Sequence, residues 1–314
     1  MRAHVIPPPA NNVSSWTIAG AAPLQRGATV VRALFELTKP RLALFSLLTA
    51  MAAFILARSP ASAASAWLTL LGTALSAGGA LSLNQWWERR TDALMRRTRK
   101  RPLPSHTLAP AVAFAWSASL SLGGVSLLAF TANLTAAALA AATILIYGVI
   151  YTPLKRRTRW ATEIGSISGA LPPLIGSAAA GDVLHPSALL LAAVLVFWQM
   201  PHFFAIGWMY RRDYYAAGFP LLPATDPTGV RTARWSLGYT FGLIAVSLLG
   251  APAAQVGPIY YAAALLGGAF FLERAWRFLR DERRRDEAAR RLFLASICYL
   301  PLLLSALLLE WILG

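Results

Sequence analysis

The chain has 314 residues, of which 57% are hydrophobic and 13% are charged, and its mean hydropathy is +0.53. These values exclude a soluble globular domain and indicate an integral membrane protein. The net charge of +16 would suit nucleic acid in a soluble protein, but here the basic residues lie in short breaks between apolar runs, where they act as topology signals, so nucleic acid is excluded as a partner.

The first 33 residues are rich in Pro, Ala and Asn and lack the apolar core of a secretory signal. We therefore expect a disordered cytoplasmic N-terminal tail over 1–33 and one membrane domain over 34–314. The domain opens on Lys39-Pro40-Arg41, in which Pro40 suits the first turn of a helix and the two cations suit the depth of lipid headgroups.

Nine apolar runs follow that suit a hydrocarbon core about 30 Å thick. They lie at 42–57, 66–87, 109–130, 134–152, 163–180, 187–209, 236–253, 258–279 and 293–313. The breaks on one side hold a single basic residue, Arg58, whereas the N-terminal segment and the breaks on the other side hold 28 of the 29 Lys and Arg residues. The nine runs predict an all-α bundle of nine transmembrane helices in the lipid bilayer. The positive-inside rule predicts that its N-terminus is cytoplasmic and its C-terminus external.

The end of the second run carries oxygen ligands on one helix face. Asn84, Glu88 and Asp92 lie at i, i+4 and i+8, and seven basic residues fall between 89 and 101. A hard cation such as Mg²⁺ takes such ligands and often keeps substrate phosphates in its other positions. The stretch favours a magnesium site that binds a diphosphate; the alternative is a solvated loop with helix-stabilising ion pairs.

A second polar group lies within the sixth run. Gln199 and His202 are three residues apart in an apolar span, where polar side chains are costly and usually face the bundle interior. We expect them to line a cavity; the alternative is that both satisfy backbone groups freed by Pro201. Asp213 follows this run much as Asp92 ends the second, so two similar half-sites on one membrane face would be able to share a diphosphate.

Four cations follow the fourth run. Positive-inside signalling accounts for their charge, but Lys155 and Arg156 are also candidates to bind phosphate. Glu163 begins the next span and is expected to pair with Arg157 or Arg159.

Three remaining features are expected to be structural. Dense Gly and Ala residues predict close helix packing, and Pro172-Pro173 predicts a bent helix. The charges from Glu273 to Arg291 lie on every face and predict a cytoplasmic helix extension without chemistry. Cys298 is the only cysteine, so no disulfide forms within the chain.

The pattern Asn84…Glu88…Asp92, followed by Met95-Arg96-Arg97-Thr98, resembles the first acidic motif of the UbiA-type intramembrane prenyltransferases. Seven blocks in order resemble more narrowly the protohaem IX farnesyltransferase (haem O synthase) branch. They are Leu37 to Arg41, Leu83 to Gln85, Met95 to Pro104, Tyr151 to Arg156, Gly169 to Gly176, Trp198 to Phe203, and Asp213-Tyr214. The block Trp-Gln-Met-Pro-His-Phe discriminates best, since quinone-directed relatives share the acidic motifs but not this block.

The resemblance implies a central cavity open near the cytoplasmic face of a bacterial-type inner membrane. It implies transfer of farnesyl from farnesyl diphosphate to a vinyl group of haem B, with addition of water, to give haem O for haem-copper terminal oxidases. The implied Mg²⁺ ligands are Asn84, Glu88, Asp92 and Asp213; the diphosphate contacts are Arg97, Lys155 and Arg156; and the further substrate contacts are Trp198, Gln199, His202 and Tyr214. The catalytic candidates are Asp92, Asp213 and Arg97.

Two details refine this picture. Many superfamily members have a second acid four residues after the first in the second motif, but here position 217 is Ala and the next acid is Asp226, which leaves the second metal site open. His202 lies about 10 Å inward from Met209 at 1.5 Å per residue, a depth that suits the iron or a propionate of a porphyrin, and Trp198 is placed to stack on the ring.

Other functions stay open. A prenyltransferase for a quinone-precursor aromatic acid is the nearest alternative. A transporter should hold its polar groups near the midplane, and a haem electron-transfer subunit needs two buried axial ligands per haem, whereas only His202 lies within a span. The sequence also leaves open an association with a haem A synthase or a terminal oxidase.

Overall fold

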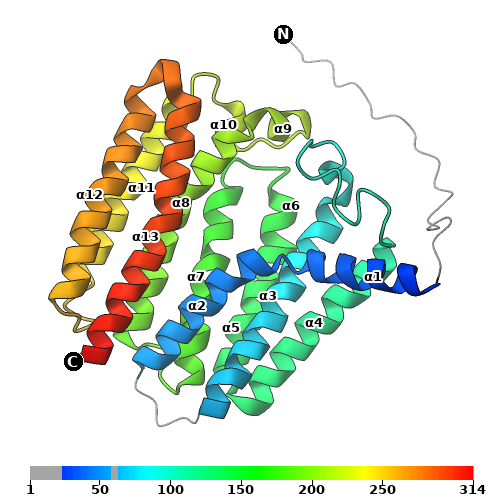
Figure 1. Ribbon diagram of the computed structural model, residues 1–314, viewed down its shortest axis with the longest axis horizontal. Coiled ribbons are helices and arrows are strands. Elements are labelled where there is room, and N and C mark those ends of the chain that lie inside the picture. The colour runs from blue at the N-terminus through cyan, green and yellow to red at the C-terminus, as the bar shows by residue number, and fades with distance from the viewer. Residues whose placement is uncertain (1–22, 58–62, 314) are drawn as a thin grey trace.

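The computed structural model describes residues 23–57 and 63–313, and this part of the chain contains helices and loops but no strand (Figure 1). The α-helices are α1 (Pro23–Leu37), α2 (Pro40–Leu56), α3 (Ala63–Asp92), α4 (Pro110–Thr131), α5 (Leu134–Ile144), α6 (Thr152–Leu154), α7 (Ala161–Ala179), α8 (Pro186–Met209), α9 (Arg211–Ala216), α10 (Leu222–Thr225), α11 (Val230–Leu249), α12 (Pro258–Arg280) and α13 (Arg285–Leu313). A π-helix, η1 (Leu145–Tyr151), joins α5 to α6, and a 3₁₀ turn, η2 (Glu282–Arg284), joins α12 to α13. The predicted all-α fold is confirmed for these residues.

Several helices are long and apolar enough to cross a membrane. Five segments in the described chain qualify, namely α3, α4, α5 through α6, α8, and η2 with α13; the pair α1 and α2, bent by 46°, would make a sixth if it crosses as one span. Each predicted apolar run falls on a helix, but α7, α11 and α12 do not reach the same combination of length and hydropathy. The chain is thus a multi-pass helical membrane protein, and nine crossings stay a prediction.

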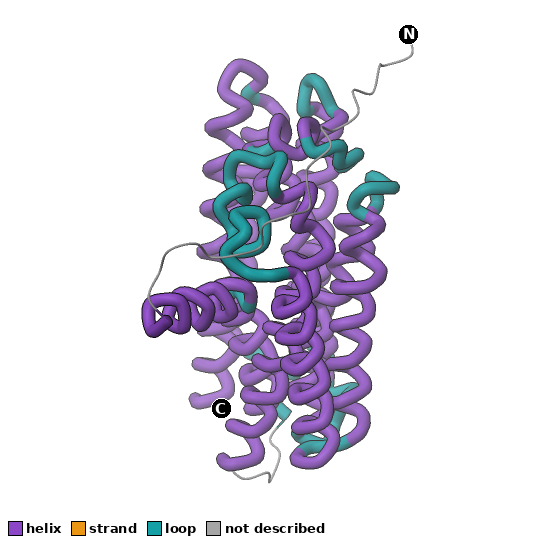
Figure 2. Tube along the Cα trace, turned by 90° about the vertical axis from the view of Figure 1, so that its right-hand side faces the viewer, coloured by secondary structure: helices purple, strands orange, loops and turns teal. Residues whose placement is uncertain are grey.

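The long helices lie side by side in one bundle (Figures 1 and 2). In Figure 1, α3, α4 and α5 form one side and α8, α11, α12 and α13 form the other, with α2 and α7 between them. α2 and α7 pack against each other, and both also contact α3 and α8. The loop after α3 gathers with α9 and α10 at one end of the bundle, which brings together segments distant in the sequence.

Prolines begin several of these helices. The first N–H groups of a helix have no partner within it, so a residue without an N–H loses nothing there. The prolines at such starts are Pro40, Pro110, Pro186 and Pro258. Asn133 caps α5 by accepting a hydrogen bond from the Ala136 amide at 2.8 Å, and it also donates to the Ala178 carbonyl of α7 at 2.6 Å.

Small residues bring the helices close together, as the sequence predicts. A Cβ at Gly79 of α3 would lie 3.0 Å from the Ser117 carbonyl of α4, and the Ser117 hydroxyl donates to the Gly79 carbonyl at 2.9 Å. A Cβ at Gly176 of α7 would collide with the Ala50 carbonyl oxygen of α2. Both helix pairs therefore depend on the missing side chain.

The predicted N-terminal tail ends too late in the chain. Residues 1–22 lie outside the described part, but Pro23–Ala33 belong to α1, which lies across the bundle at one side (Figure 2). Leu37 is fully buried and packs in one cluster with Val30, Leu34 and Trp86. Apolar residues at 30, 34 and 37 make one helix face, and this packing accounts for the ordered helix.

One smaller expectation also needs adjustment. The charged stretch from Glu273 to Arg291 is not a single extension, because α12 ends at Arg280 and the chain turns through η2 before α13 begins. α7 continues as one helix through Pro172 and Pro173, and the bend expected there stays a prediction.

Candidate active site

The acidic face of α3 lies at the end of the helix where the loops gather. Asn84, Glu88 and Asp92 stack along one face, as their spacing predicts, and all three are buried. Asp92, the last residue of α3, is only 1% exposed. A buried carboxylate is costly unless cations or hydrogen-bond donors surround it, so the partners of these groups define the site.

Two basic side chains pair with the two carboxylates. Lys155 Nζ lies 2.8 Å from Glu88 Oε1, and Arg101 Nη1 lies 2.8 Å from Asp92 Oδ2. Both carboxylates are thus held by cations from segments that follow α3 and α6 in the chain. Lys155 was predicted to bind phosphate and lies here beside the acidic face, whereas no role was predicted for Arg101.

The third member of the acidic face, Asn84, joins two further segments. Its Oδ1 accepts a hydrogen bond from Lys39 Nζ at 3.1 Å, and its Nδ2 donates to Thr152 Oγ1 at 3.1 Å. Lys39, between α1 and α2, was expected only at headgroup depth. We refer below to the α3 cluster, which comprises Lys39, Asn84, Glu88, Asp92, Arg101, Thr152 and Lys155.

The π-helix η1 sets the position of the segment that carries Lys155. A Cβ at Gly148 would lie 2.7 Å from Leu83 Cδ2 of α3, and a Cβ at Gly165 of α7 would lie 2.7 Å from the Tyr151 ring. The two glycines therefore let α3 and α7 close on η1. Lys155 Nζ lies 5.2 Å from the centroid of the Tyr151 ring, which adds a cation–π contact to its ion pair.

Arg97 and Tyr214, both predicted site residues, lie beside each other. The Tyr214 hydroxyl accepts a hydrogen bond from Arg97 Nη2 at 2.5 Å, and the guanidinium lies 4.9 Å from the centroids of the Tyr210 and Tyr214 rings. The Phe219 ring links this pair to the α3 cluster, since its centroid is 5.8 Å from that of Tyr214 and 5.6 Å from Lys155 Nζ. Basic and aromatic groups thus form a continuous patch.

Two other predicted residues have side chains without a hydrogen bond or ion pair to any residue in the described part of the chain. Asp213, in α9, is half-buried and makes no hydrogen bond or ion pair through its side chain. Arg156 follows α6 and is exposed. The structure therefore brings neither of them into contact with the α3 cluster.

The electrostatics of the α3 cluster keep Lys155 charged. Burial alone would lower the pKa of the Lys155 ammonium, but the Glu88 carboxylate beside it offsets that effect and raises the pKa well above its ordinary value. The ion pair is therefore formed at neutral pH.

One oxygen of the α3 cluster is free for a further ligand. Asp92 Oδ1 is buried and has no hydrogen-bond partner among the described residues, while Oδ2 pairs with Arg101. Within 23–57 and 63–313, no three His, Cys, Asp or Glu side chains lie close enough to hold a metal ion by themselves. Carboxylate and amide oxygens fit Mg²⁺ that shares its coordination with a phosphate-bearing substrate, and the ligand set itself stays a prediction.

The polar residues of α8 lie on other helix contacts. Trp198 Nε1 donates to the Ser296 carbonyl of α13 at 2.8 Å, and His202 Nδ1 lies 2.7 Å from Ser296 Oγ. The Trp198 and His202 rings stack with centroids 5.1 Å apart. Gln199 donates to the Ser166 carbonyl of α7 at 3.3 Å. We call Trp198, Gln199, His202 and Ser296 the α8 seam; none of their polar contacts is with the α3 cluster.

Two acids whose roles were open now have positions. The expected pair of Glu163 with Arg157 or Arg159 does not form, and Glu163 Oε2 is buried without a hydrogen-bond partner in the described chain. Asp226 Oδ2 accepts hydrogen bonds from the Thr232 amide at 2.8 Å and the Thr232 hydroxyl at 2.9 Å. Asp226 therefore caps the first turn of α11.

A helical membrane bundle whose acidic helix end is surrounded by cations has the architecture of an intramembrane prenyltransferase. The sequence pattern of the UbiA prenyltransferase family matches residues 45–297, so the chain belongs to this family.

Two similar proteins within this family carry the same name. The chain is 44% identical to a protoheme IX farnesyltransferase of Opitutus terrae, with 88% of this chain and 93% of that protein covered. It is 40% identical to a protoheme IX farnesyltransferase of Solibacter usitatus, with 89% and 99% covered.

Solved structures share the fold at low sequence identity. A digeranylgeranylglyceryl phosphate synthase superposes with a TM-score of 0.74 at 15% identity, covering 89% of this chain and 98% of the other. A UbiA homologue from Archaeoglobus fulgidus bound to GPP and Mg²⁺ superposes with a TM-score of 0.58 at 12% identity, covering 88% and 99%.

Proposed function

We propose that this protein transfers a farnesyl group from farnesyl diphosphate to a vinyl group of haem B, with addition of water, to form haem O and diphosphate. Relatives that carry the name protoheme IX farnesyltransferase, at 44% and 40% identity over most of both chains, support this activity. Haem O would serve haem-copper terminal oxidases. A haem A synthase or a terminal oxidase is therefore a candidate partner, and copurification with this protein tests such an association.

The α3 cluster is the observation that carries the proposal. It sets three basic side chains, Lys39, Arg101 and Lys155, beside two carboxylates, Glu88 and Asp92. These basic groups are fixed in a largely buried place. Such a site suits a leaving group whose negative charge grows as its bond breaks, because the cations need no reorganisation during the reaction.

The reaction makes definite demands on the protein. The C1–O bond of farnesyl diphosphate breaks, and its electron pair leaves with the diphosphate. The vinyl group then attacks the allylic cation, water adds to the resulting porphyrin cation, and a proton is released. Tyr151 and Phe219 already lie against the Lys155 ammonium and present ring faces suited to a cation, while the apolar surroundings limit premature attack by water.

We propose Mg²⁺ as the cofactor, held by Asn84, Glu88, Asp92 and Asp213. The free Asp92 Oδ1 and the unbonded Asp213 side chain support this set, as does the Mg²⁺ named with the fold relative from Archaeoglobus fulgidus. When bound, the ion would supply further positive charge to the departing diphosphate. A titration of activity with Mg²⁺ tests the set: Asp213→Asn should raise the Mg²⁺ concentration needed, and an unchanged titration would remove Asp213 from it.

The remaining predicted residues divide between the two substrates. Arg97 and Arg156 are proposed to contact the diphosphate, and Tyr214 orients Arg97 through their hydrogen bond. We propose His202, with the other predicted residues of the α8 seam, Trp198 and Gln199, on the side of haem B. A central cavity open towards the cytoplasm would join the α3 cluster to the α8 seam.

We propose nine crossings with a cytoplasmic N-terminus and an external C-terminus. The uneven distribution of Lys and Arg between alternate breaks supports this orientation. Reporter fusions in 88–107, 153–161, 210–235 and 280–292 should all report the cytoplasm. One external signal among them contradicts the topology.

The decisive experiment is direct. Membranes that contain the protein are incubated with haem B, farnesyl diphosphate and Mg²⁺, and the haems are analysed by mass spectrometry. We expect haem O, dependent on the protein and on farnesyl diphosphate. Prenylated 4-hydroxybenzoate in a parallel reaction, without haem O, would instead support the quinone-directed alternative.

A further inference from the structure

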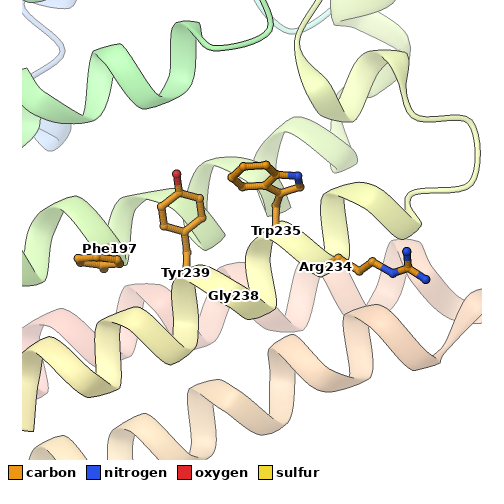
Figure 3. A pocket seen from close by; sticks show the side chains of 5 residues that line it. All are labelled: Phe197, Arg234, Trp235, Gly238 and Tyr239. Carbon is orange, nitrogen blue, oxygen red and sulfur yellow. The ribbon is translucent and has the colours of Figure 1, made fainter.

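A groove on the surface of the bundle lies outside the α3 cluster and the α8 seam. Its volume is about 370 Å³, and it is lined by Phe197 of α8 and by Arg234, Trp235, Gly238 and Tyr239 of α11 (Figure 3). This volume falls within the range of small-molecule sites. The reaction proposed above uses none of the five residues.

Aromatic rings form the wall of the groove. The Trp235 and Tyr239 rings, one helical turn apart, have centroids 5.9 Å apart and are inclined by only 31°. Phe197 extends the wall, with its centroid 6.1 Å from that of Tyr239, and Trp160 at the start of α7 contacts Trp235 at 5.7 Å. The wall therefore runs from the start of α7 across α11 to α8.

The floor of the groove is open. A Cβ at Gly238 would meet no atom within 4 Å, and Gly238 is exposed. The site therefore has room for a chain or ring against the aromatic wall. It also means that a larger side chain at 238 would enter the groove without striking the protein around it.

Cations stand at one end of the groove only. Arg234 lies beyond Trp235, towards the start of α11 (Figure 3). Arg231 precedes it by three residues and Gly238 follows by four, so all three share one face of α11. Both arginines are exposed and make no ion pair with a described residue. Glu163, the carboxylate that interacts with Tyr239, has its Oε2 atom buried.

We propose that this groove binds an anionic phospholipid, with its phosphate at Arg231 and Arg234 and one acyl chain along Gly238 against Phe197, Trp235 and Tyr239. The guanidinium fork suits phosphate oxygens, and basic pockets between membrane helices hold lipid headgroups in this manner. The order of the residues along α11 also suits a phospholipid. The arginines that would bind the headgroup lie in the first two turns of the helix, and the apolar residues that would contact the acyl chain lie further along it. The proposal is independent of the reaction.

The test uses the full chain, purified and reconstituted in nanodiscs of phosphatidylcholine with or without phosphatidylglycerol. Native mass spectrometry counts retained lipids, and thermal unfolding reports stabilisation. The wild type should retain phosphatidylglycerol preferentially and unfold at a higher temperature with it. Arg231→Gln with Arg234→Gln should weaken that preference about ten-fold or more. Gly238→Leu should remove one retained lipid, because it occupies the place of the acyl chain.

Matched controls separate this site from general effects. Gly123→Leu alters a helical glycine of α4 that also has no atom within 4 Å of its Cβ position. Arg283→Gln with Arg284→Gln removes the same charge from exposed positions in η2. Both controls should retain phosphatidylglycerol as the wild type does.

Two results would overturn the proposal. Equal loss of lipid in the η2 control would mean that overall charge, not the groove, selects the lipid. Unchanged lipid retention in Gly238→Leu, together with a raised KM for haem B or farnesyl diphosphate, would make the groove a substrate passage instead.

Discussion

The α3 cluster and the α8 seam are both polar groups in an apolar bundle, yet they are built differently. In the α3 cluster, charged side chains from four segments balance one another and leave Asp92 Oδ1 without a partner. In the α8 seam, neutral groups bond to the neighbouring helices, and Trp198 and His202 both use Ser296. The first arrangement can exchange a protein cation for a ligand, whereas the second already satisfies its members. The difference supports the proposal that the charge of the substrate is bound at the α3 cluster, whereas the contacts of the α8 seam join neighbouring helices.

The largest effect should follow from breaking the buried ion pair. Lys155→Met leaves the Glu88 carboxylate without its counter-charge, and an uncompensated buried charge should lower the free energy of unfolding by about 3 kcal/mol. Denaturant unfolding in detergent micelles measures this. The double variant Lys155→Met with Glu88→Gln should recover much of the loss, because no unpaired charge remains. Equal loss in the single and double variants would show that the pair does not act as a unit.

The next effect concerns turnover. Asp92→Asn removes the carboxylate that pairs with Arg101 and carries the free Oδ1, so haem O formation should fall by about 10²-fold or more. Mass spectrometry of haem products measures it against the amount of folded protein. Asp182→Asn, an exposed acid in the loop between α7 and α8, is the matched control and should keep full activity. Near-normal turnover in Asp92→Asn with ordinary Mg²⁺ dependence would exclude the proposed role.

The acidic face could be predicted from the sequence because helix periodicity alone places Asn84, Glu88 and Asp92 together. Its partners could not. Lys39 is 45 residues from Asn84, and Lys155 is 67 residues from Glu88, and nothing in a single sequence pairs segments that far apart.

Local sequence patterns predict some features of the structure and not others. The long helices followed from hydropathy, which acts within each run. Arg101 is one of five cations in the loop after α3, and only the fold of that loop brings it, rather than another of them, to Asp92. The helix over 23–33 has a readable signal, the apolar face of Val30, Leu34 and Leu37, which the Pro and Ala content of the tail obscures. The capping role of Asp226 is not visible in the sequence, because it depends on where α11 begins.

A smaller effect separates the two readings of the α8 seam. If His202 contacts the acceptor, His202→Ala should weaken haem B binding about ten-fold, the usual scale for one good contact, while farnesyl diphosphate binding holds. Absorbance titration with haem B and separate diphosphate binding measure the two. Ser296→Ala is the control, because it removes the bond to His202 and leaves the imidazole. If both variants only lower the unfolding temperature and keep normal kinetics, His202 joins α8 to α13 and does not bind haem.

The smallest effect should follow from substitution of Asp226. This variant tests whether an acid at the end of the bundle that holds the α3 cluster takes part in the reaction. Asp226 is 4% exposed, and its Oδ2 satisfies the Thr232 amide, which has no partner within α11. Asp226→Ala should therefore lower the free energy of unfolding by about 1 kcal/mol, the usual cost of losing a cap, with unchanged activity per folded molecule. A metal ligand would behave otherwise, since its loss would raise the Mg²⁺ requirement and leave stability nearly intact. Thr232→Val is the matched variant: it removes the hydroxyl that donates to the same oxygen while keeping the amide, so it should cost less than Asp226→Ala and also leave the Mg²⁺ titration unchanged.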